Sequence, residues 1–101
     1  MPRLAVRFRL AVTCVLALLL AAPAQAECYV DYKAKQDNPL RLAYGVSQVS
    51  DEVCDKPKQA KAELVPRLAA EGWTLLKILS SFGPEGLGER KTSAGEFYLR
   101  Y

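Results

Sequence analysis

The sequence predicts an α+β fold, in which a three- or four-stranded antiparallel sheet carries one helix packed on one face. Three observations predict it. Two segments early in the domain alternate apolar and polar residues, which is typical of half-buried strands. A stretch with helical spacing of apolar residues comes next. Two further segments of strand character complete the order strand, strand, helix, strand, strand.

Residues 1–26 have the composition of a cleavable secretory signal peptide. Three arginines precede an uncharged, mainly apolar run of 13 residues at 10–22, and an A-x-A cleavage signal ends at Ala26. The run is shorter than the roughly 20 apolar residues of a membrane-spanning helix. We expect cleavage after Ala26, or alternatively after Ala24. This would leave one small domain at residues 27–101, periplasmic or secreted, with no stable membrane span.

The charge of the domain differs from that of the whole chain. The chain has 14 basic and 11 acidic residues, a net charge of +3. The leader contains three of the basic residues and none of the acidic ones, so residues 27–101 are electrically neutral. No basic stripe remains in the domain, and we therefore expect no binding to nucleic acid.

Two cysteines, Cys28 and Cys54, remain once the leader is removed. An even pair in an exported chain of this size predicts a disulfide bond. It would close a loop of about 27 residues, for which loop entropy gives roughly 3.5 kcal/mol of stability. A redox-active pair is disfavoured because the spacing is not C-x-x-C. Two distant cysteines in a chain without histidine do not make a zinc site.

The first two strands are predicted at residues 28–34 and 40–49. In the first, Cys28, Val30 and Tyr32 would share one face. The Asp-Asn-Pro sequence at 37–39 predicts a turn, so the two strands are expected to form an antiparallel hairpin. Gly45 is expected to mark a bulge in the second strand.

A helix is predicted from Lys56 to Glu71. Asp55 followed by Pro57 suits a helix start, and Gly72 suits a stop. Apolar residues recur at four-residue intervals within it: Ala60, Leu64 and Leu68. Pro66 is expected to kink the helix or to split it, since an interior proline deletes a hydrogen bond and clashes with the preceding turn.

The last two strands are predicted at residues 73–82 and 89–101. Apolar residues occupy both parities of the first, which predicts a central strand, covered on both faces or covered by a partner. Trp73 is expected to enter the core directly after the glycine stop. The glycine-rich segment 83–95 is expected to be a flexible hairpin connection, with Ala94-Gly95 as a bulge.

Three motifs of the chain resemble a small uncharacterised bacterial family, domain of unknown function 4177. They are Tyr29-x-x-Tyr32-Lys33, then Leu64-x-x-x-Leu68-Ala69-Ala70-Glu71-Gly72-Trp73-x-Leu75, then Phe97-x-Leu99-Arg100. The chain departs from that family in its leader, its cysteine pair, Pro66 and a longer second strand. The resemblance implies a fold of strands around a helix. It implies no catalytic residue, because the family has no assigned activity.

The 83–95 connection is also the first candidate for an interaction loop, because long loops on a stapled scaffold often carry recognition. The residues expected to make contacts are Glu85, Leu87, Arg90 and Lys91. A phosphate-binding loop is disfavoured, because the P-loop order is absent and no helix is expected to follow the glycines.

Two other groups of side chains are candidate sites. Tyr29 and Tyr98 would form an aromatic patch for a partner if both lie on outward strand faces. The alternative, which we favour, is a structural role, because tyrosine is common in strands. The acidic cluster Asp51, Glu52 and Asp55 lacks the order of a calcium loop, so a solvated helix entry is the better interpretation.

Catalysis is disfavoured by the residues that the chain lacks. Without histidine there is no Ser-His or Cys-His nucleophile system, and nothing places two acids in a shared pocket. We expect no cofactor and no metal. The sequence therefore favours a non-enzymatic binding or envelope accessory module, with a periplasmic or envelope protein as the partner. The alternative is a small inhibitor of an exported hydrolase.

Overall fold

The computed structural model describes residues 27–101, so the expected leader lies outside the described residues. The chain forms three strands, two α-helices and three short 3-10 helices. The main elements are β1 (Cys28–Gln36), β2 (Arg41–Val49), α2 (Pro57–Ala69), β3 (Thr74–Phe82) and α3 (Leu87–Ala94). Within the described residues, no helix is long and apolar enough to cross a membrane.

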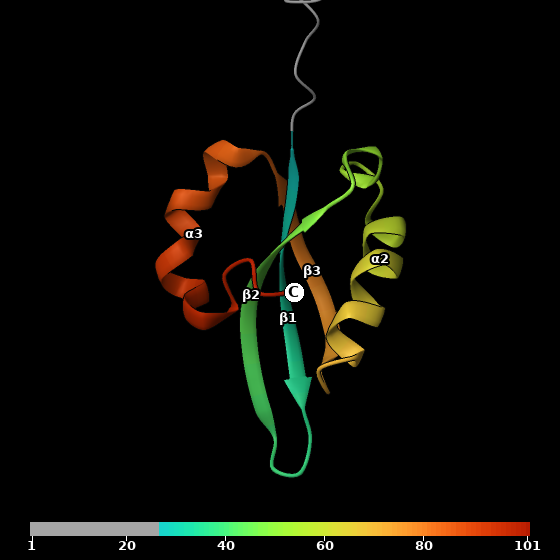
Figure 1. The fold of residues 1–101 in the computed structure, drawn as a ribbon, viewed down its shortest axis with the longest axis vertical. Coiled ribbons are helices and arrows are strands. Elements are labelled where there is room, and N and C mark those ends of the chain that lie inside the picture. The colour runs from blue at the N-terminus through green and yellow to red at the C-terminus, as the bar shows by residue number, and fades with distance from the viewer. Residues whose placement is uncertain (1–26) are drawn as a thin grey trace, which may run out of the picture.

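The sheet is antiparallel throughout, with the strand order β2-β1-β3 (Figure 1). The predicted hairpin of β1 and β2 is confirmed. The prediction that β3 is central is wrong, because β1 occupies the centre and β3 lies at an edge. Two register shifts in the β1–β3 pairing explain the misleading pattern. Parity along a strand no longer identifies a face once extra residues are inserted.

Helix α2 covers one face of the sheet and α3 covers part of the other (Figure 1). The α2 side holds the main core, in which Cys28, Val30 and Tyr32 share a face as expected. Gly45 is not a bulge, since the β1–β2 register is continuous. A Cβ atom at Gly45 would lie 2.4 Å from the Tyr32 hydroxyl, so glycine is required by the close approach of this ring.

Helix α2 is a single helix that contains Pro66, so the proline does not split it. Pro57 lies in the first turn as predicted, but Lys56 rather than Asp55 occupies the capping position, without a side-chain cap. Gly72 ends this region with a φ of 80°. Trp73 then enters the core, where its ring meets Phe97 edge-on at 5.1 Å between centroids.

The predicted fourth strand at 89–101 is wrong. Residues 87–94 form α3, and the tail after it makes only one bridge to the sheet, between Val46 and Tyr98. The tail alternates for another reason. It runs over the edge of β2, and its side chains are divided between the cores on the two sides of the sheet. Phe97 and Tyr101 pack on the α2 side, and Tyr98 packs on the α3 side. The architecture is therefore α+β with two helices, one of them after the last strand.

The predicted disulfide is present between Cys28 and Cys54, with 5.7 Å between the Cα atoms. It ties the start of β1 to the connection that precedes α2. The bond thus closes the hairpin and its following connection into one covalent loop.

Candidate functional site

The sheet face that carries α3 has two halves of different chemistry. The strand register arranges its side chains in four cross-strand rows: Tyr29 with Gln48 and Phe82, Asp31 with Val46 and Ser80, Lys33 with Tyr44 and Lys77, and Lys35 with Leu42 and Thr74. Helix α3 packs over the first two rows, which we call the covered half. The other two rows, toward the β1–β2 turn, form the open half.

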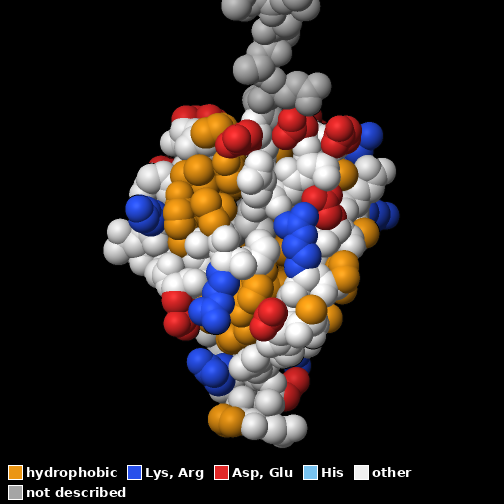
Figure 2. All heavy atoms as spheres, in the orientation of Figure 1, with side chains coloured by type: hydrophobic (Ala, Val, Ile, Leu, Met, Phe, Trp, Pro, Cys, Tyr) orange, Lys and Arg blue, Asp and Glu red, His pale blue; other side chains and the backbone are white. Residues whose placement is uncertain are grey.

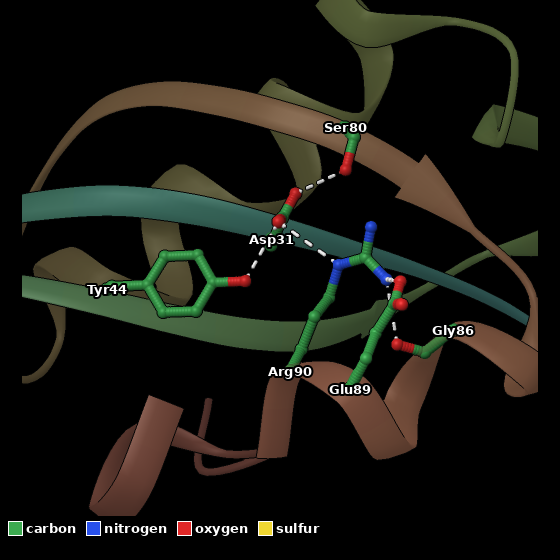
Figure 3. Close-up of polar contacts among 6 residues, drawn as sticks. All are labelled: Asp31, Tyr44, Ser80, Gly86, Glu89 and Arg90. Carbon is green, nitrogen blue, oxygen red and sulfur yellow. Dashed lines mark hydrogen bonds and ion pairs between the residues drawn. The ribbon is translucent and has the colours of Figure 1, made fainter. Parts of the chain in front are cut away.

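A buried carboxylate, Asp31, lies at the centre of the covered half and is only 7% exposed. Its oxygens accept three hydrogen bonds (Figure 3). Ser80 Oγ donates at 2.6 Å and Tyr44 Oη at 2.9 Å. Arg90 Nε donates at 3.2 Å and forms an ion pair with the same carboxylate. The donors come from β2, β3 and α3, so Asp31 joins three elements at one point.

Arg90 connects this cluster to α3. Its Nη1 donates to the carbonyl of Gly86 at 2.8 Å and to the carboxylate of Glu89 at 2.6 Å. Its guanidinium carbon lies 3.9 Å from the centroid of the Phe82 ring, a cation–π contact. These contacts hold the inward face of α3 against the sheet.

The electrostatics of the cluster favour the charged forms of Asp31 and Arg90. Burial alone would raise the pKa of Asp31, but hydrogen bonds from Ser80, Tyr44 and Arg90 outweigh it and lower the pKa below its usual value. Burial and the bond to Asp31 raise the pKa of Tyr44 to about 12. The charged carboxylate accepts hydrogen bonds from three elements and thereby fixes α3 against the sheet.

The open half is exposed and mixed in character. Leu42 is 71% exposed and Leu76 is 45% exposed. They border a shallow groove of about 240 Å³, whose lining residues are Lys33, Ala34, Leu42, Ala43, Tyr44 and Leu76. In the lower part of the molecule, toward the β1–β2 turn, Figure 2 shows apolar side chains at the surface beside both positively and negatively charged ones.

Lys33 lines this groove and has no acidic partner within residues 27–101. Lys33 and Lys77 lie opposite each other on neighbouring strands, and both are exposed. Neither forms an ion pair within residues 27–101. Lys35, in the next row, pairs with Asp37 at 3.4 Å. The open half therefore combines exposed leucines with unneutralised positive charge.

The cations beside the two other hollows are already engaged. In a hollow of about 450 Å³, Arg67 donates to the Gln48 carbonyl and to Glu63, each at 2.7 Å. In a hollow of about 320 Å³, Arg41 stacks over Trp73. These arginines connect elements of the fold, in contrast to the lysines of the open half.

The expected interaction loop is a 3-10 turn followed by helix α3, which corrects its description as a flexible connection. Leu87 packs against the α3-side core and Arg90 binds Asp31, so both point inward. Glu85 and Lys91 are exposed. A helical signal was present in this segment: Leu87, Arg90 and Ala94 recur at helical spacing, and Gly95 follows as a stop. The glycine-rich composition led us to expect a loop instead.

The expected aromatic patch is covered, because α3 packs where an exposed sheet face was predicted. Tyr29 is 5% exposed and stacks on Phe82, and its hydroxyl donates to Glu27. Tyr98 is half-buried in the same cluster. Asp31 and Ser80 were missed as a site because the alternation of β1 placed Asp31 on a solvent face. No local signal in the chain points to their meeting.

The acidic residues Asp51, Glu52 and Asp55 lie at the surface near the start of α2. Within residues 27–101, no group of three or more histidine, cysteine, aspartate or glutamate side chains is arranged to hold a metal ion.

Comparison with known proteins identified no relative: no protein-family model matches the chain, and neither a curated protein nor a solved structure matches it.

Proposed function

We propose that this chain is a non-enzymatic binding module that docks a partner protein on the open half of its sheet. The observation that carries the proposal is the pair of leucines, Leu42 and Leu76, exposed on either side of one groove. Single exposed leucines are ordinary on protein surfaces. Two that border a common groove, on a face that a helix leaves half uncovered, form a surface suited to contact.

The size of the groove favours a protein over a small molecule. Pockets for drug-sized ligands measure roughly 300–1,000 Å³ and enclose most of the ligand. The groove here is about 240 Å³ and shallow. It has room for one or two side chains of a partner, which is how anchor residues at protein interfaces are seated.

We further propose that the module acts outside the cytoplasm, after removal of residues 1–26. The leader composition supports this, and so does the bond between Cys28 and Cys54. Structural disulfides persist in oxidising compartments and are rare in the cytosol.

The alternative of a hydrolase inhibitor needed a rigid exposed loop at 83–95. That segment is largely helical, and two of its four expected contact residues, Leu87 and Arg90, face inward.

Site-specific photo-crosslinking tests the binding function. A photoreactive residue with a large apolar side chain replaces Leu42 in the full chain, expressed with its leader in the native host, so that the groove keeps an apolar group at this position. A matched control carries the same residue at 61, an exposed position on the outer side of α2. We expect a discrete adduct with one protein from position 42 and none from position 61. Identical adducts from both positions, or none from 42, would contradict the proposal.

A further inference from the structure

The open half carries a charge conflict that its own fold leaves unrelieved. Lys33 and Lys77 are cross-strand partners on adjacent strands. Like charges directly opposite each other on a sheet are destabilising. The two acids nearest to Lys33 in the chain are paired with other residues, Asp31 with Arg90 and Asp37 with Lys35. An anionic group bound between Lys33 and Lys77 would remove this repulsion.

The groove and the charge belong to one surface. Lys33 lines the same groove as Leu42 and Leu76, so its aliphatic stem borders the apolar floor. Its ammonium group is at the exposed end of that stem. A ligand that seats an apolar side chain in the groove therefore brings its neighbouring groups to the Lys33 head.

We infer that the partner presents an acidic segment to this surface, with one apolar side chain seated between Leu42 and Leu76 and flanking carboxylates against Lys33 and Lys77. The inference rests on the proposed function and adds the chemistry of the partner. Apolar contact provides the anchor, and complementary charge provides selectivity and speeds association.

A second copy of this chain does not fit the surface. A two-fold interface brings the same patch of both copies together. Lys33 and Lys77 of one copy would then meet the same lysines of the other, and like charges placed together across an interface cost several kcal/mol.

An anionic bilayer fits less well than a protein segment. The apolar floor is a groove, which receives a protruding group, whereas a bilayer surface offers none. A membrane is therefore the competing occupant that the experiment must separate.

Selection from a displayed random peptide library tests the inference. The processed protein, purified from a host that expresses the full chain with its leader, is the immobilised target. We expect the enriched peptides to combine an apolar residue with aspartate or glutamate on either side. Affinity for the strongest peptide should fall several-fold from 0.1 to 1 M salt, as the screening length drops from about 10 to about 3 Å.

A matched pair of charge reversals locates the contact. Lys33→Glu with Lys77→Glu should weaken the selected peptide about tenfold or more, equivalent to at least about 1.4 kcal/mol. Lys58→Glu with Lys61→Glu makes the same change in net charge on exposed positions of α2 and should change the affinity less than about twofold. Both variants are compared by circular dichroism to confirm that the fold is retained.

The outcomes separate the two proposals. Peptides that bind through Leu42 but are neutral or basic would overturn the acidic partner and leave the binding function standing. Equal weakening by both charge reversals would also overturn it. Failure to select any peptide that depends on Leu42 would overturn both. Binding to phosphatidylglycerol vesicles that is lost in Lys33→Glu with Lys77→Glu, in the absence of peptide binding, would assign the surface to membranes and refute the acidic segment.

Discussion

The two faces of the sheet are made from the same three strands and yet differ in almost every respect. Beneath α2, most of the cross-strand residues are apolar and belong to the main core, and Val30, Tyr32 and Leu64 are completely enclosed. Beneath α3, the buried rows centre on a carboxylate and the remaining rows are open. One face is built for stability, and the other leaves surface available for a partner.

Helix length explains much of this difference. A strand of nine residues spans about 30 Å, at about 3.3 Å per residue. The 13 residues of α2 span about 20 Å, whereas the eight of α3 span about 12 Å. Helix α3 is therefore too short to cover four rows, and the rows nearest the β1–β2 turn stay exposed.

The largest effect is expected from truncating the buried face. Leu64→Ala should lower the free energy of unfolding by roughly 3 kcal/mol, because the side chain is fully buried and its removal leaves a cavity in the core. Urea denaturation followed by circular dichroism measures it. A loss below about 1 kcal/mol would mean that the α2 side is not the main core.

A smaller loss is expected from adding one methyl group on the same face. Gly45→Ala should cost about 2 kcal/mol, since its Cβ atom would lie 2.4 Å from the Tyr32 hydroxyl and 2.5 Å from the ring. Gly88→Ala is the control, because that position in α3 has open space around it. There we expect a gain of about 0.5 kcal/mol from helix propensity. Equal effects at both glycines would disprove the close packing.

The hydrogen bonds that Asp31 accepts beneath α3 are expected to contribute less to the free energy of unfolding than the main core does. Asp31→Asn keeps the size of the side chain but replaces an acceptor oxygen with an amide NH2 group, which donates, and removes the charge that faces Arg90. We expect a loss of about 1.5 kcal/mol at pH 7, measured by urea denaturation. No loss at all would mean that the Asp31 bonds do not hold α3.

The same variant gives a pH test. The pKa of Asp31 is lower in the folded chain than its usual value, so its contribution is complete above about pH 4 and disappears as the pH falls through the folded pKa. The stability difference between wild type and Asp31→Asn should therefore shrink between pH 5 and pH 2. Wild type and variant share all other carboxyl groups, so the titration of those groups cancels in the stability difference. A constant difference would contradict a lowered pKa.

The smallest effect on stability is expected in the open half. Leu42→Ser should change the free energy of unfolding by less than about 0.5 kcal/mol, because the side chain is 71% exposed. The same substitution should abolish the photo-crosslinked adduct formed from a reactive residue at position 76. Substantial destabilisation would show that Leu42 belongs to the core, and an undiminished adduct would remove it from the docking surface.

Several elements could be predicted from residues close together in the chain. The hairpin followed from alternation and a turn sequence, and α2 from the spacing of Leu64 and Leu68. The pairing of Cys28 with Cys54 followed because residues 27–101 contain only these two cysteines. Such signals are local, so they survive without knowledge of the fold.

Short-range patterns failed where distant segments compete for the same place. Alternation at 97–101 is compatible with a strand, but the edge of β2 accepts only one bridge there, and the tail divides its side chains between two cores. Likewise Asp31 alternates as a solvent-facing residue, and becomes buried only because Arg90, 59 positions later, reaches it from α3.

Composition and local spacing were therefore sufficient to predict the neutral charge of residues 27–101, the hairpin, helix α2 and the disulfide bond. Which strand lies in the centre, what α3 covers and which half of its face stays open depended on three-dimensional packing. The physical reason is that a side chain is buried only when another element covers it. The length and position of that covering element are determined by residues elsewhere in the chain.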